Sequence, residues 1–259
     1  MPLGSEPAKR NRLKSGPSGL VLQPRDLLLL RSLALLRLLD RRQIERLAGF
    51  HSVSRVNVRL GRLRDAGLIR RYFTATNTGS RRSIYALSNQ GAREAHVPFV
   101  PTKWRPDSVL LGNAFVAHQL ALNDLYIAAK GQGIRWQQPT SPLSSAVRII
   151  PDALLANAER SFFLEMDLGT EALPVWRQKV SAYMRLAVTG QYRGIIPHPH
   201  FAVLVVTDKE TRLEQLRRHI AKQTSKLFWF ATLDTIIGQG FWSASWLRAT
   251  DDTRSPPGE

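Results

Sequence analysis

Apolar residues near the start of the chain follow a helical pattern. They occupy most positions from Pro24 to Leu39, which predicts a largely buried helix that begins at a proline. Asp40 is suited to cap a second, short helix, and Gly49 is suited to end it. The pattern therefore predicts two successive helices before residue 50.

A third helix is predicted from Ser52 or Ser54 to about Ala66. Its apolar residues recur at helical spacing and predict a stripe that packs on the core. This stripe contains Val56, Leu60 and Leu63. Arginines form a parallel stripe about 100° away around the helix. That second stripe contains Arg55, Arg59 and Arg62. The helix is thus predicted to pack on one side and to present guanidinium groups on the other.

Two strands are predicted after this helix, at residues 68–74 and 81–87. The segment Asn77-Thr78-Gly79-Ser80 provides a turn between them, and Ser88 begins a further helix. This order of helices and basic hairpin closely resembles the bacterial winged helix-turn-helix pattern over roughly residues 24–96. The resemblance implies that the third helix enters the major groove of DNA while the wing touches phosphates. The DNA-contacting residues that it implies are Arg55, Asn57, Arg59, Arg62, Arg81 and Arg82.

The rest of the chain predicts an α/β domain behind a proline-rich linker at residues 97–107. Ser108 is suited to cap a long helix that reaches about Lys130. Strands are then predicted at 134–137, 147–155, 162–168, 201–206 and 227–231. Helices are predicted at 172–188 and 209–222. This order favours three layers within residues 108–250.

The two ends of the chain lack such patterns. Residues 1–23 combine Gly, Pro and Ser with basic residues and predict a flexible arm, and residues 251–259 predict a disordered tail. The arm could follow DNA phosphates or could have no specific role.

Positive charge is concentrated in the N-terminal part. The chain has 37 Lys and Arg against 20 Asp and Glu, a formal net charge of +17. Residues 1–97 carry a net +13 and residues 98–259 only +4. General solubility does not explain this asymmetry, which favours nucleic-acid binding by the first domain.

The absence of cysteine excludes disulfides, thiolate catalysis and cysteine-ligated zinc. The apolar run from Leu27 to Leu39 is interrupted by Arg31 and Arg37 and has only 13 residues, too few to span a bilayer. We therefore expect a cytoplasmic protein that does not associate with a membrane.

Acidic residues stand within the apolar strands of the second domain. Pro151-Asp152 precedes Glu165-Met166-Asp167 by thirteen residues, and Glu165 and Asp167 share one face of a strand. Buried carboxylates are costly unless they are paired, which argues against idle positions. Asp152 could equally be a turn residue after Pro151.

These residues resemble the PD-(D/E)xK signature of restriction-endonuclease-like nucleases. The resemblance implies an endonuclease-like α/β fold and a Mg²⁺ or Mn²⁺ site formed by Asp152, Glu165 and Asp167. Asp167 stands where the signature has its lysine, so Lys179 on the next helix is the candidate replacement, as known in that superfamily. The candidate catalytic residues are Asp152, Glu165, Asp167, Lys179 and Tyr183.

Over most of residues 24–235 the chain also resembles the replication-relaxation family of plasmids and other mobile elements. The matching residues are His118, Asn123-Asp124, Pro151-Asp152, the run from Glu165 to Glu171, Lys179 and Tyr183. The family is distantly similar to mobilisation relaxases that nick DNA. The resemblance implies a DNA-binding protein of a mobile element, with metal-dependent nicking as its candidate activity.

Other interpretations stay open. A non-catalytic regulator of transcription or replication, with an inactive endonuclease-like domain, is favoured by Asp167 in the lysine position. Covalent cleavage by Tyr183 is a third hypothesis. His118 is interpreted as a hydrogen-bonded core residue, and His198 and His200 as a loop rather than a metal site. The expected partners are double-stranded DNA, a second copy of the chain, and replication or mobilisation proteins.

Overall fold

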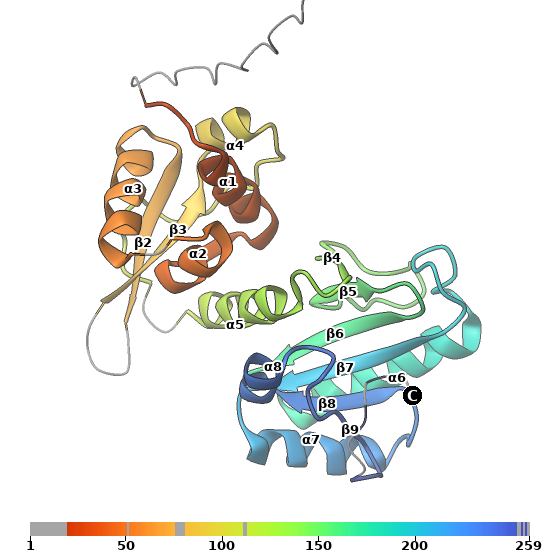
Figure 1. The fold of residues 1–259 in the computed structure, drawn as a ribbon. Helices are drawn as coiled ribbons and strands as arrows, with labels where there is room; N and C mark the ends of the chain where they lie inside the picture. Colours follow the sequence, from red (N-terminus) through yellow and green to blue (C-terminus); the bar gives the residue numbers. More distant parts are fainter. Residues whose placement is uncertain are drawn as a thin grey trace, which may run out of the picture. The chain divides into compact units, whose positions relative to one another are not determined.

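The computed structural model describes residues 20–50, 52–75, 81–110 and 113–252, together with Ser255 and Pro257. It is an α+β structure that divides into two compact units, Met1–Gly112 and Asn113–Glu259. Figure 1 shows the elements of both units. Residues 1–19 of the predicted arm at 1–23, the predicted turn at 77–80 and most of the predicted tail at 251–259 lie outside the described residues. No helix within the described ranges is long and apolar enough to cross a membrane.

The first unit combines helices with a small antiparallel sheet. Its elements are α1 (Pro24–Leu36), β1 (Leu38–Asp40), α2 (Arg41–Ala48), α3 (Val53–Asp65), β2 (Ile69–Ala75), β3 (Arg81–Leu87) and α4 (Asn89–Ala95). The sheet order is β1-β3-β2, and Figure 1 labels β2 and β3. Val56, Leu60 and Leu63 of α3 are buried, as the helical spacing predicts.

Capping residues set the limits of the first helices. The side chain of Asp40 accepts a hydrogen bond from the backbone N–H of Gln43 at 2.8 Å, and Gly49 ends α2 with a left-handed φ of 63°. Both caps confirm the prediction. The first helix ends earlier than predicted, because Leu38–Asp40 pair with β3 as β1.

The predicted linker at 97–107 is attached to the first unit. The backbone N–H groups of Asp107 and Leu110 donate to the carbonyls of Arg71 and Phe73 in β2, both at 2.7 Å. Trp104 packs edge-on against Tyr72, with ring centroids 5.6 Å apart. Because residues 107–110 are hydrogen-bonded alongside β2, the long helix does not begin at Ser108 as predicted.

The second unit contains a mixed six-stranded sheet. Its elements are α5 (Ala114–Ala129), β4 (Arg135–Gln137), β5 (Ala153–Ala156), β6 (Ser161–Asp167), α6 (Leu173–Thr189), β7 (Phe201–Thr207), α7 (Glu210–Ala221), β8 (Phe228–Thr232), α8 (Leu233–Gln239) and β9 (Leu247–Arg248). The strands follow the order β4 to β9, and β6, β7 and β8 are parallel while the outer pairs are antiparallel.

Helices cover both faces of this sheet, which gives three layers (Figure 1). One core joins α6 and α7 to residues such as Phe163 and Val205, and the other joins α5 and α8 to residues such as Leu164 and Leu204. The short helix α8 and strand β9 were not predicted. The predicted strand 147–155 is reduced to β5, and Asp152 lies just before it.

Candidate functional site

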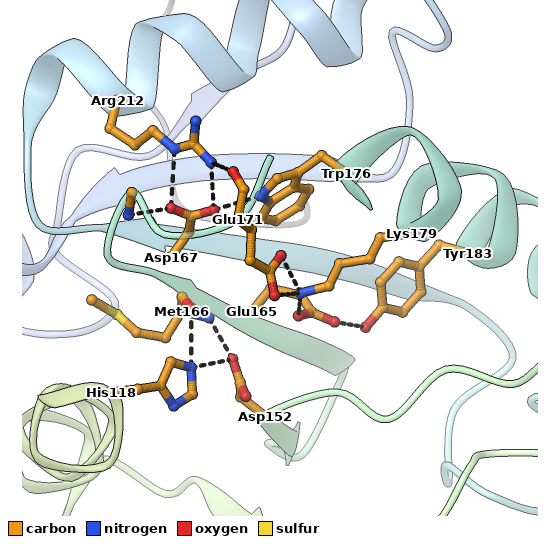
Figure 2. A network of polar contacts seen from close by, with 11 residues as sticks. His118, Asp152, Glu165, Met166, Asp167, Glu171, Trp176, Lys179, Tyr183 and Arg212 are labelled. Carbon is orange, nitrogen blue, oxygen red and sulfur yellow. Dashed lines mark hydrogen bonds and ion pairs between the residues drawn. The ribbon is translucent and has the colours of Figure 1, made fainter. Parts of the chain in front are cut away.

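Strand β6 directs its acidic residues toward α6 and α7. Phe162, Leu164 and Met166 point into the core beneath α5. The alternate positions, Glu165 and Asp167, bond to residues of α6 and α7. Figure 2 shows both carboxylates on this side of the strand, as alternation predicts.

Glu165 lies in a closed network with two residues of α6. Its side chain is 1% exposed. Lys179 donates to one carboxylate oxygen at 2.9 Å, and the hydroxyl of Tyr183 donates to the other at 2.5 Å (Figure 2). Lys179 also donates to Glu171 at 2.8 Å. Glu165 therefore has a partner at each oxygen, and Lys179 lies between two carboxylates.

Burial and charge act in opposite directions on this network. Burial raises the pKa of Glu165 to about 7, although the charge of Lys179 opposes that rise. Burial alone would lower the pKa of Lys179, but Glu165 and Glu171 raise it above its ordinary value. Burial and the neighbouring Glu165 raise the pKa of Tyr183 well above 10.0. Lys179 thus stays charged near neutral pH, and Tyr183 keeps its proton.

Asp167 is held by a separate set of donors. The guanidinium of Arg212 on α7 donates to both carboxylate oxygens, at 3.0 and 2.9 Å. The indole of Trp176 and the backbone N–H of Gly169 each add a bond at 2.5 Å (Figure 2). Burial would raise the pKa of Asp167, but these donors lower it below 3.8. The acid in the lysine position of the signature thus binds an arginine of α7.

Asp152 lies at the edge of β6, where β5 has not yet begun. One of its carboxylate oxygens accepts from the backbone N–H of Met166 at 2.7 Å and lies 3.1 Å from Nε2 of His118 (Figure 2). Burial lowers the pKa of His118, but the hydrogen bond to Asp152, the charge of Asp152 and the carbonyl of Met166 together raise it by more, so the net shift is upward. His118 is therefore a hydrogen-bonded residue that fixes Asp152.

The three predicted metal ligands thus have different partners. Within the described residues no group of three or more His, Asp or Glu side chains is placed to hold a metal ion, and this includes His198 and His200. The ring of His198 instead bonds to the hydroxyl of Ser161 at 2.7 Å. The charge of Asp152 raises the pKa of Glu165, but the two carboxylates form their hydrogen bonds with different residues.

The predicted DNA-contacting residues lie on two elements of the first unit. Arg55, Asn57 and Arg62 of α3 are exposed, and so are Arg81 and Arg82 of β3. Arg82 also lies 3.5 Å from Asp40.

Arg59 differs from this set, because its predicted place in an exposed stripe is wrong. Its side chain is buried, with Nε bonded to Asp26 at 2.9 Å and Nη2 bonded to the carbonyl of Val21 at 2.9 Å. The guanidinium neutralises Asp26, which is otherwise a buried carboxylate in α1.

Sequence reasoning missed the partners that complete these networks. Arg212, Trp176 and Glu171 surround the acidic strand, and Asp26 binds Arg59. Glu171 was named as the end of the run that matches the family, but its bond to Lys179 was not predicted. Arg212 lies 45 residues from Asp167, so only the packing of α7 on the sheet brings them together.

Comparisons with known proteins place the chain in a family. The model of the replication-relaxation family matches residues 30–198, which include β6 and the acidic residues around it. The search of curated proteins found no match, and the search of solved structures found none either. Because the match covers more than half of the sequence, this chain belongs to the replication-relaxation family.

Proposed function

We propose that this chain binds double-stranded DNA of a plasmid or mobile element through its first unit and acts in the replication or relaxation of that DNA. The family's description supports the second part of this proposal. The observation that carries the first part is the two-sided character of α3. Val56, Leu60 and Leu63 are buried against the unit, while Arg55 and Arg62 face solvent.

The arrangement around α3 suits a winged helix-turn-helix. Helix α2 precedes α3, and a hairpin of β2 and β3 follows it. This hairpin corresponds to the wing, and β3 begins with two basic residues. An α-helix fits the major groove of B-DNA, where arginine donates two hydrogen bonds to guanine. A net charge of +13 within residues 1–97 adds attraction to the phosphates.

Titration of a labelled duplex over several salt concentrations tests this proposal. We expect the Arg55→Ala/Arg62→Ala variant to bind more weakly and with a shallower salt slope, because each lost cation removes a counterion-releasing contact. A matched control is Arg148→Ala/Arg185→Ala, which removes two exposed arginines of the second unit. Equal affinity and slope for both variants would contradict the assignment of α3.

A second candidate function is metal-dependent strand cleavage by an endonuclease-like second unit. One observation favours it: Lys179 of α6 reaches Glu165, as expected of a lysine that replaces the missing one on the strand. Asp152 and Glu165 would hold the ion, since Mg²⁺ is commonly bound by one or two carboxylates together with substrate phosphates. A bound Mg²⁺ would supply polarisation of the scissile phosphate.

The residues fit such an ion in part. Glu165 must be ionised to act as a ligand, and its pKa of about 7 makes ion binding stronger above neutral pH. Asp167 is not available, because Arg212 and Trp176 bind both of its oxygens. Lys179 and Tyr183 likewise bind both oxygens of Glu165, so an ion at Glu165 would have to displace one of these donors. Tyr183 is fully buried and its hydroxyl donates a hydrogen bond to Glu165, which argues against a covalent tyrosine mechanism.

Incubation with supercoiled plasmid, with and without Mg²⁺ or Mn²⁺, separates cleavage from regulation. If the second unit cleaves, Asp152→Asn and Lys179→Met should abolish metal-dependent nicking while duplex binding persists. Glu159→Gln, which changes an exposed acid outside the network, should nick normally. If the parent protein leaves the plasmid supercoiled under all these conditions but binds DNA, the non-catalytic regulator is the better interpretation.

A further inference from the structure

The exposed face of α3 carries a pocket as well as arginines. The pocket has a volume of about 290 Å³. Its lining residues are Gln23, Arg25, Phe50, Ser54, Arg55, Val58, Arg59 and Arg62. They combine cations with apolar groups, and they come from α1, the segment before α3, and α3 itself.

The apolar part of this pocket includes an exposed valine between two arginines. Val58 follows Arg55 by three positions and precedes Arg62 by four, so the three residues lie on one side of the helix. Its side chain is 57% exposed, although a branched aliphatic residue in solvent gains nothing from that exposure. The guanidinium of Arg25 lies over the ring of Phe50, 5.0 Å from its centroid. The lining of the pocket thus combines apolar side chains with arginines, which we call its cationic rim.

Arg59 also lines the pocket, but its side chain is buried. Its guanidinium already bonds to Asp26 and to the carbonyl of Val21. The rim groups directed by α3 are therefore Arg55 and Arg62, on either side of Val58.

We propose that this pocket receives the 5-methyl group of a thymine in the major groove, with Val58 against the methyl and Arg55 and Arg62 directed to neighbouring guanines. This inference rests on the DNA-binding function proposed above. Thymine is the base that places a methyl group in the major groove, and guanine offers the two acceptors that an arginine fork fits. The occupant must also be compatible with the cationic rim, and DNA is, because its phosphates are negatively charged.

The same contact would reject cytosine at that position. Cytosine presents an amino group in the groove and lacks the methyl, so Val58 would leave a donor without a partner. The protein is therefore inferred to prefer sites in which a thymine lies close to guanines.

The test compares thymidine with deoxyuridine, which differs from it only by the absence of the 5-methyl group. Duplexes that the full chain binds tightly are first selected from a random pool. Each thymine of a selected site is then replaced in turn by deoxyuridine, and affinity is measured by fluorescence anisotropy. We expect one replacement to weaken binding about fourfold, the value for one buried methyl group.

Val58→Ala should bind thymine and deoxyuridine at that position about equally. Val53→Ala is the matched control, because Val53 is 49% exposed on the same helix but does not line the pocket. It should keep the parent's preference for thymine.

The outcomes separate this inference from the function on which it rests. If the parent binds duplex DNA but no deoxyuridine replacement changes its affinity, the thymine pocket is wrong and DNA binding stands. Retention of the thymine preference in Val58→Ala would also overturn it, because another residue would then contact the methyl. If the parent binds no duplex at all, the proposed function itself fails.

Discussion

At the residue scale, Arg59 shows how position along a helix can mislead. It belongs by spacing to the arginine stripe of α3, yet its guanidinium lies against Asp26. Both side chains are largely buried, at 10% and 0% exposure. Removing one partner of a buried ion pair strongly destabilises a protein, because the remaining charge is buried without a partner.

We therefore expect Arg59→Ala to lower the free energy of unfolding by roughly 3–5 kcal/mol. Chemical denaturation of the full chain measures this change. The double variant Arg59→Ala/Asp26→Ala should be less destabilised than the sum of the single variants. An Arg59→Ala protein that is fully stable but has lost base discrimination would restore the original prediction for this residue.

Asp167 gives a second residue-scale prediction, and its sign follows from its pKa. The donors around it lower that pKa from 3.8, so its contribution to stability is present above this value and is lost as pH falls through the lower folded-state pKa. We expect Asp167→Asn to reduce the free energy of unfolding by roughly 3–5 kcal/mol at pH 7, because Arg212 loses its buried partner.

The difference between this variant and the parent should shrink in solutions more acidic than pH 3.8. Urea denaturation of both proteins at pH 7, 5 and 3 measures this difference in the free energy of unfolding, provided that both are still folded at the lowest pH. A difference that is the same at all three values would show that charge at Asp167 contributes nothing.

At the scale of elements, local signals predicted the helices with clear caps. Asp40, Gly49 and the apolar spacing of α3 act within one or two turns, so the sequence contains the whole signal. Strand β1 was missed because Arg37, which has φ of 63°, ends α1 without a glycine, and the pairing partner of Leu39 is the distant Tyr85. The start of α5 was missed for a similar reason, since residues 107–110 bind β2.

The candidate site was predictable only in its acidic residues. The shared face of Glu165 and Asp167 follows from strand alternation, and Lys179 was expected from a resemblance. Which cation meets which carboxylate depends on how α6 and α7 pack on the sheet, and the sequence pattern holds no such information.

The contact between α4 and the start of β2 gives an element-scale prediction. A Cβ at Gly91 would lie 2.0 Å from the carbonyl oxygen of Leu68, whereas a Cβ at Gly61 of α3 would meet nothing within 4 Å. We expect Gly91→Ala to destabilise the protein, because the backbone at Leu68 or Gly91 must move to make room for the added methyl group. Gly61→Ala should stabilise it by roughly 0.5–1 kcal/mol, because alanine favours the helix interior. Thermal unfolding of both variants beside the parent checks the opposite signs.

At the scale of the whole molecule, the division into two compact units bears on how the chain unfolds. Each unit has its own sheet and its own buried residues. Chains of this kind often depart from a single two-state transition.

We expect calorimetry of the full chain to show two transitions. Gly91→Ala should lower the midpoint of one, and Asp167→Asn should lower the midpoint of the other. A single transition that both substitutions shift equally would mean that the units unfold as one.

The bonds of Glu171 have a further consequence, for the motion of the loop after β6. Its carboxylate binds Lys179 of α6, and its backbone carbonyl accepts from Arg212 of α7 at 2.5 Å. The loop at 168–172 is thereby bonded to both α6 and α7. A movement of the loop away from one of these helices would also strain its bond to the other. Its amides should exchange with deuterium as one cooperative group, and Arg212→Ala should speed that exchange throughout the loop. The rate at which the loop opens would then determine how often Lys179 loses its bond to Glu171 and keeps only its bond to Glu165.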